Sequence, residues 1–171
     1  MNPRQGGRAD RSDRPRLTSV SGQGTPERHP RLTLQWSDDA GKTRTSIKAV
    51  SGIPVVVIEG ALVAQTARPC REAIDAVLRM RPARVVLDLG GVRVTDRSTP
   101  ELLEAMRRFA HWHGVALSLA AVPVGVQSRL ESWSPRPVFD QHATSERAVN
   151  AALSMPRARR SVIPRDSLGG A

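Results

Sequence analysis

The sequence predicts a single small α/β domain with a mixed, mostly parallel sheet, an antiparallel edge hairpin and about four helices. Residues 44–154 alternate short β-branched apolar runs with stretches of helix-like apolar periodicity. Single helices between consecutive strands require crossover connections, which make at least part of the sheet parallel. The first two strand-like runs are instead separated only by a Ser51-Gly52 turn, which is typical of an antiparallel hairpin.

Composition places this domain between two arms. The chain has 171 residues, and its only aromatic residues are three Trp and two Phe, so the core must be aliphatic. Residues 1–43 are rich in Arg, Gly, Pro and Ser, and we predict a disordered arm there. Residues 155–171 are predicted to form a flexible basic tail. Within the first arm, LTLQW at 32–36 alternates apolar and polar residues and is compatible with an extra edge strand.

The first half of the domain is predicted as a hairpin followed by a helix. Strands are expected at 44–50 and 55–60, the second closed by Gly60, and a helix begins near Thr66. The apolar stripe of that helix is formed by Cys70, Ile74, Val77 and Leu78. Because Cys70 lies on this stripe, we predict a small core residue rather than a reactive thiol.

The second half is predicted to alternate strands and helices. RVVLDL at 84–89 is an almost unbroken apolar run, typical of a strand covered on both faces. The next helix is expected from Pro100 to His113, with Gly114 at its C-cap and a core stripe of Leu102, Leu103, Met106, Phe109 and Ala110. The remaining elements are a strand at 115–121, a helix at 124–133, an edge strand at 137–139 and a helix at 145–153 capped by Thr144.

Charge and hydropathy exclude several classes of protein. The formal net charge is +10, but the excess is spread: residues 1–43 carry eight Lys/Arg against five Asp/Glu, and residues 155–171 carry four against one. No interleaving of aromatic and basic residues marks a stacking surface, so we expect no specific nucleic-acid partner. No apolar run reaches the roughly 18 residues of a membrane span, and the charged N-terminus lacks a signal-peptide core. We therefore expect a cytoplasmic protein without membrane insertion.

Motifs for catalysis, cofactors or metals are missing. There is no phosphate-binding loop, nucleophile elbow, HExxH or pair of cysteines. His111 and His113 are close in sequence, but residues two apart on a helix do not face each other. Ser128 and Arg129 fit an exposed helix face. The sequence thus predicts no enzyme, no cofactor and no metal site.

The informative segment spans residues 87–106 and leads from a buried strand through a loop into a helix. A helix N-terminus offers unpaired N–H groups and partial positive charge. Thr99 precedes Pro100, which suits Thr99 as the N-cap with Ser98 just outside the helix. A capping box from Ser98 to Glu101 is the alternative register.

This segment resembles the STAS domain family, the fold of bacterial anti-sigma factor antagonists. The resemblance covers about residues 44–153 and rests on D-L-x-x-V-x-x-x-D-x-S from Asp88 to Ser98, directly before a helix. The earlier I-P-V-V-V-I-E-G-A-L is also similar to the second strand of the family and its glycine. The resemblance implies that the residue after the second aspartate is a Ser or Thr, phosphorylated by an anti-sigma factor that is also a kinase.

Here that residue is Arg97, and the neighbouring Ser98 is the remaining candidate phosphoacceptor. The resemblance implies a non-enzymatic regulator whose partner is an anti-sigma factor of the serine-kinase type. The alternative is a STAS scaffold subunit that binds a different partner, such as a transporter ATPase. We predict that the partner contacts Asp96, Arg97, Ser98 and Thr99. Because a helix N-terminus disfavours a cation, we expect Asp96, Glu101 or Glu104 near the guanidinium of Arg97.

Overall fold

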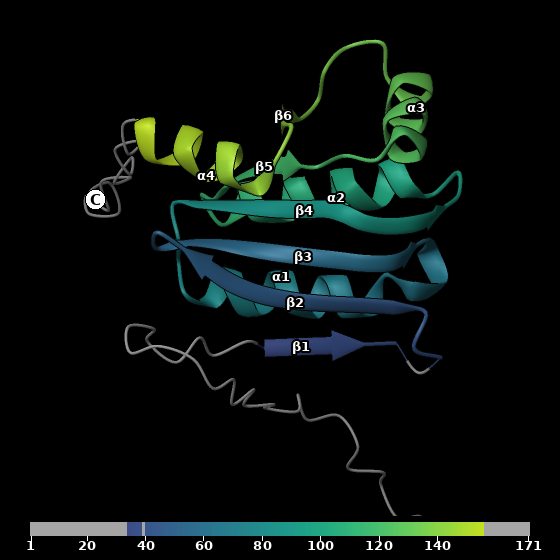
Figure 1. Cartoon of the computed structure of the whole chain (residues 1–171), viewed down its shortest axis with the longest axis horizontal. Coiled ribbons are helices and arrows are strands. Elements are labelled where there is room, and N and C mark those ends of the chain that lie inside the picture. Colours follow the sequence, from purple (N-terminus) through teal and green to yellow (C-terminus); the bar gives the residue numbers. More distant parts are fainter. Residues whose placement is uncertain (1–33, 39, 156–171) are drawn as a thin grey trace, which may run out of the picture.

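The computed structural model describes residues 34–38 and 40–155, which form one six-stranded sheet in the order β1-β2-β3-β4-β5-β6 (Figure 1). The strands are β1 (Leu34–Ser37), β2 (Thr43–Val50), β3 (Ile53–Leu62), β4 (Arg84–Thr95), β5 (Ala116–Ala120) and β6 (Asp140–His142). The helices are α1 (Arg68–Arg79), α2 (Thr99–Trp112), α3 (Val124–Trp133) and α4 (Ser145–Ser154), with a 3-10 turn at Ala64–Thr66.

Strand directions confirm the predicted mixed sheet. β1, β2 and β3 pair antiparallel, whereas β3, β4, β5 and β6 pair parallel. The predicted hairpin turns at Ser51 and Gly52, whose φ angles of 50° and 78° are those of a tight turn with the twist of the strands. The extra edge strand with which the LTLQW pattern is compatible is present as β1, which pairs Leu34 with Ile47 of β2. Residues 1–33 and 156–171, where most of the predicted arm and tail fall, lie outside the described residues.

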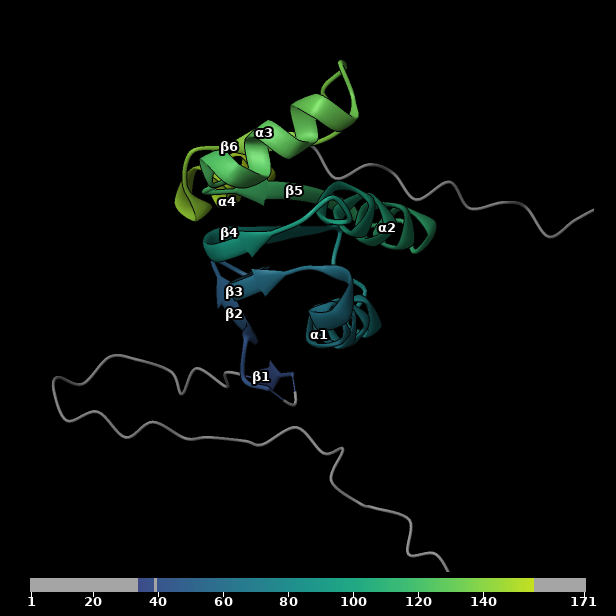
Figure 2. The same ribbon diagram turned by 90° about the vertical axis from the view of Figure 1, so that its right-hand side faces the viewer.

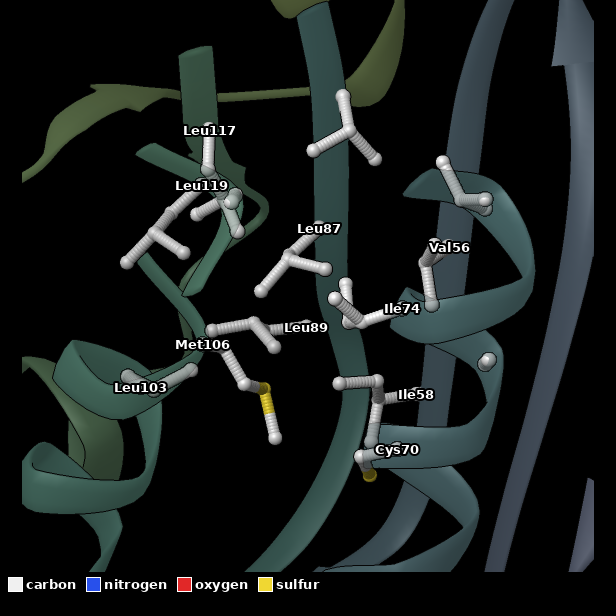
Figure 3. Close-up of a cluster of buried hydrophobic side chains, with 14 of the residues drawn as sticks. Val56, Ile58, Cys70, Ile74, Leu87, Leu89, Leu103, Met106, Leu117 and Leu119 are labelled. Atoms are coloured by element: carbon white, nitrogen blue, oxygen red, sulfur yellow. The ribbon is translucent and has the colours of Figure 1, made fainter. Parts of the chain in front are cut away.

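The two faces of the sheet are covered unequally. α1 and α2 lie on the same face (Figure 2) and close over the larger apolar cluster, to which α3 contributes Val126 and Leu130. Figure 3 shows the centre of this cluster, where Leu87, Leu89 and Leu119 of the sheet lie among Ile74 of α1 and Leu103 and Met106 of α2. The opposite face carries a smaller cluster, in which α4 contributes Ala148 and Val149.

Cys70 belongs to the larger cluster, as predicted. Its side chain is fully buried, and its Sγ lies 3.5 Å from Oγ1 of Thr45 on β2. Burial raises the pKa of the Cys70 thiol, and the contact with Thr45 only partly opposes this effect. The thiol is therefore held neutral and has a structural role.

β3 and β4 are longer than predicted, and glycines explain the difference. β3 continues past Gly60, whose φ is 91° and where a Cβ atom would lie 2.0 Å from the carbonyl oxygen of Lys42. Only glycine fits this close approach, and the register of β3 against β4 shifts at this point. β4 likewise runs through Gly90 and Gly91 to Thr95. The two strands therefore end side by side, with Leu62 paired to Thr95.

Other element boundaries also differ. The chain near Thr66 forms a 3-10 turn, and α1 begins only at Arg68. The strand expected at 137–139 is instead β6, because Pro137 cannot donate to the ladder and Phe139 inserts its side chain into the core. The prediction that Phe109 belongs to the core stripe of α2 is wrong, since this side chain is 41% exposed and packs edge-on against His113.

One predicted helix cap is confirmed, and a second lies one residue from the predicted position. The Oγ1 of Thr144 accepts a hydrogen bond from the backbone N–H of Arg147 and caps α4. Gly114 follows the C-cap residue His113 of α2 with a φ of 71°, the left-handed conformation that ends many helices.

Candidate functional site

The loop between β4 and α2, residues 95–99, is held against the connection that follows β3. Because β3 and β4 are adjacent and parallel, their carboxyl ends meet at one end of the sheet (Figure 1). The site is therefore built from two segments, 62–66 and 95–99, that are about thirty residues apart in the chain. Two hydrogen bonds join the segments: the Ala64 N–H donates to Ser98, and Thr99 donates to the carbonyl oxygen of Leu62.

Thr99 is a buried linker rather than the predicted N-cap. It is the first residue of α2, and its side chain is fully buried. Its Oγ1 donates a hydrogen bond to the carbonyl oxygen of Leu62 at 2.7 Å and accepts one from the backbone N–H of Asp96 at 3.1 Å. The N-cap prediction is wrong because a tertiary partner, the end of β3, competes for this hydroxyl.

Ser98 occupies the N-cap position, in the alternative register, but its side chain does not cap the helix. Its Oγ donates to Oδ1 of Asp96 at 2.6 Å and accepts from the backbone N–H of Ala64 at 3.0 Å. Oδ1 of Asp96 also accepts the backbone N–H of Ser98 at 2.9 Å. Asp96 and Ser98 thus brace the loop, and the Ser98 hydroxyl is engaged in both hydrogen-bonding directions.

Arg97 is the exposed member of the loop. Within residues 34–38 and 40–155, no carboxylate forms an ion pair with it, so the expected acidic neighbour is not found. Asp96 is turned toward Ser98, and Glu104 binds Arg107 with two hydrogen bonds of 2.6 and 2.7 Å. Those bonds lower the pKa of Glu104 and raise the pKa of Arg107. The side chain of Arg97 is therefore exposed without an ion pair to any described residue.

α3 supports the loop from the other side through Arg129, although the sequence pattern favours an exposed face for this residue. Nε of Arg129 donates to Oγ1 of Thr95 at 3.1 Å, and its guanidinium also reaches the carbonyl oxygen of Thr95 at 3.4 Å. No local pattern reveals this contact, because it joins residues 34 apart.

Val94 and Val124 are 55% and 82% exposed and lie at the end of β4 and the start of α3.

The described residues hold neither a cluster of metal ligands nor a membrane-spanning helix. No group of three or more His, Cys, Asp or Glu side chains that could hold a metal ion occurs within residues 34–38 and 40–155. Among the same residues, none of the helices has the length and apolar character needed to cross a bilayer. The loop presents one exposed cation, Arg97, on a frame held by the hydrogen bonds of Ser98 and Thr99.

Comparison with known families identifies the fold that carries this loop. The family model of the STAS domain matches residues 44–148. The chain therefore belongs to the STAS domain family, as its sequence resemblance suggested. The matched range includes β2 through the first turn of α4, and with them the whole of the 95–99 loop.

Solved structures show the same fold at low sequence identity. An anti-sigma factor antagonist from Mycobacterium paratuberculosis superposes with a TM-score of 0.56 at 20% identity, over 68% of this chain and 97% of that one. The unphosphorylated antagonist SpoIIAA gives 0.51 at 17% identity, over 66% and 98%. The murine anion transporter Slc26a9 gives 0.53 at 17% identity, over 62% of this chain but only 18% of the transporter. Comparison with curated protein sequences finds no match.

Proposed function

We propose that this chain is a non-enzymatic regulatory module, similar to an anti-sigma factor antagonist, that binds a protein partner through the 95–99 loop. The partner we propose is an anti-sigma factor of the serine-kinase type, in the cytoplasm of a bacterium. The observation that carries the proposal is the exposed Arg97 at the position that the family uses as phosphoacceptor. Both antagonists of this fold in the comparison match over nearly their whole length.

The roles of the four loop residues differ. Arg97 contacts the partner, because it is exposed and has no carboxylate neighbour among the described residues. Asp96 and Ser98 are half-buried and hold the loop in shape through their mutual hydrogen bonds. Thr99 is fully buried, so it positions the loop without touching the partner.

Phosphorylation does not switch this module at the usual position. A guanidinium cannot accept a phosphoryl group from a serine kinase, so residue 97 stays cationic. Ser98 is a poor substitute, because its hydroxyl must first release Asp96 and the N–H of Ala64. Phosphate there would also place about −1.5 to −2 charges next to the carboxylate of Asp96. We therefore propose that binding is insensitive to ATP.

Charge reversal at Arg97 tests the docking site. The partner is first recovered by affinity capture with the native chain and identified by mass spectrometry. Arg97→Glu should then weaken its binding by at least about ten-fold, whereas Arg147→Glu, an exposed reversal on α4, should leave it unchanged. Equal affinity of Arg97→Glu and the native chain would place the docking site elsewhere. Capture of a transporter ATPase would favour the scaffold alternative.

Phosphate mapping tests the regulation. The native chain and Arg97→Ser are incubated with the captured kinase and ATP, and phosphate is located by mass spectrometry. We expect no phosphate on the native loop and phosphate at residue 97 in the variant. Stoichiometric phosphate on native Ser98 would overturn this part of the proposal.

A further inference from the structure

The last two turns of α2 carry a surface that neither the core nor the 95–99 loop uses. Arg107, Arg108, His111 and Trp112 line a shallow, open hollow there. Trp112 is 89% exposed, more than any other large hydrophobic residue that the structure describes. A single exposed apolar side chain needs no explanation, but an indole among three cationic or titratable side chains combines stacking surface with positive charge.

The helix arranges these four residues as two short rows. Arg108 and Trp112 are four residues apart, as are Arg107 and His111, so the members of each row lie about 5–6 Å from each other at Cβ. Glu104, one turn before Arg107 and Arg108, is bound by Arg107, and those two charges cancel. Arg108 is exposed and forms no ion pair within residues 34–38 and 40–155. The unpaired guanidinium of Arg108 therefore leaves the hollow positive beside the indole.

We propose that this hollow, which we call the α2 patch, binds single-stranded nucleic acid without sequence preference. A base stacks on the exposed indole of Trp112, and an adjacent backbone phosphate binds the guanidinium of Arg108 one turn away. A duplex does not fit this mode, because its bases are already stacked within the helix. All four residues lie between positions 107 and 112, so the patch is local in sequence, and the expectation that aromatic and basic residues are not interleaved overlooked it.

The small apolar content of the α2 patch favours nucleic acid over an anionic membrane. Trp112 is the only apolar residue that lines the hollow, and the nearby Phe109 is 41% exposed and packs against His113, whereas a membrane-binding surface inserts several neighbouring apolar side chains. The chain also carries a net charge of +10, and residues 155–171 alone contain four Arg against one Asp. Such an excess attracts any polyanion over a distance and does not itself distinguish nucleic acid from an anionic membrane, whereas the α2 patch supplies the stacking contact. The proposal concerns a surface separate from the 95–99 loop and does not depend on the function proposed for that loop.

Fluorescence anisotropy with a labelled oligothymidylate tests the proposal on the full chain. The native protein should bind at low salt, and its affinity should fall steeply between about 50 and 200 mM salt. Trp112→Ala should weaken binding by about five-fold or more, whereas Trp112→Phe, which keeps an aromatic ring, should bind nearly as the native chain does. Arg108→Gln should also weaken binding and reduce the salt slope by roughly one.

Matched controls separate the α2 patch from the general charge of the chain. Trp133→Ala removes a half-exposed indole on α3, and Arg71→Gln removes an exposed cation on α1; both should bind as the native chain does. Thermal unfolding of each variant shows that the fold is retained. Absence of oligonucleotide binding at low salt, or equal affinity of Trp112→Ala and the native chain, would overturn the proposal. Trp112-dependent binding to anionic phospholipid vesicles in place of the oligonucleotide would overturn it as well.

Discussion

The two ends of α2 are built in different ways. At its N-terminus, side-chain hydrogen bonds of Ser98 and Thr99 tie the helix to the segment after β3, and only Arg97 points to solvent without such a bond. At its C-terminus, Trp112 and Arg108 project from the helix surface and make no tertiary hydrogen bond within residues 34–38 and 40–155. One end is held by tertiary contacts, whereas the other displays side chains that the fold does not need.

Because the two ends of α2 differ in this way, substitutions at one end should affect stability and substitutions at the other end should affect binding alone. A substitution among the braces of the 95–99 loop changes the free energy of unfolding and the loop shape together. A substitution in the α2 patch can change binding while the fold is untouched. Arg97 has features of both ends, because its side chain is exposed while its backbone belongs to the hydrogen-bonded 95–99 loop. The following variants compare the two ends of α2 by their effect on the free energy of unfolding, from the largest expected loss to the smallest.

Thr99→Val should have the largest effect. Valine keeps the shape of threonine but leaves the Leu62 carbonyl and the Asp96 N–H without their partner in a buried site. We expect a loss of about 2–3 kcal/mol in the free energy of unfolding, measured by urea denaturation. Thr99→Ser, which keeps the hydroxyl, should lose clearly less. Equal losses in the two variants would show that packing of the methyl group, and not the hydrogen bonds, holds the loop.

Ser98→Ala should have an intermediate effect. The hydroxyl bonds to Asp96 and to the Ala64 N–H, but the site is only half-buried, so water can replace part of what is lost. We expect a loss of about 1 kcal/mol by the same measurement. Because the Ala64 amide donates to Ser98, we expect its hydrogen exchange to be slower in the native chain than in the variant. Unchanged exchange there would mean that Ser98 does not brace the second segment.

Glu104→Gln, at the middle of α2, should act only above acidic pH. The hydrogen bonds from Arg107 lower the pKa of Glu104 from its ordinary value of 4.5. A carboxyl whose folded pKa is lowered stabilises the native state above its unfolded pKa, and this stabilisation is lost as the pH falls through the folded pKa. Because the pair is partly exposed, we expect less than about 1 kcal/mol at neutral pH. Melting temperatures at pH 7 and pH 3 should differ more for the native chain than for the variant.

The sequence could predict features that depend on local patterns, but not contacts between residues far apart in the chain. Apolar periodicity located α1, α2 and the buried strands, because burial leaves a repeating pattern in the chain. The segment from Asp88 to Ser98 located the loop, because its residue types and spacing are local. The bond from Thr99 to Leu62 and the contact of Arg129 with Thr95 were not predictable, since both join residues more than thirty apart. The prediction for Phe109 was wrong because a helical stripe gives the direction of a side chain but not the edge of the core.

Trp112→Ala should have the smallest effect on stability. The indole is 89% exposed, so its removal changes little of the surface that folding buries. Alanine also has a higher helix propensity than tryptophan, which offsets any lost contact with the neighbouring turn. We expect the free energy of unfolding to stay within about 0.5 kcal/mol of the native value in urea denaturation. A loss well above about 1 kcal/mol would mean that the indole packs against the protein in solution. The C-terminal end of α2 would then contribute to stability as its N-terminal end does, and the contrast between the two ends would fail.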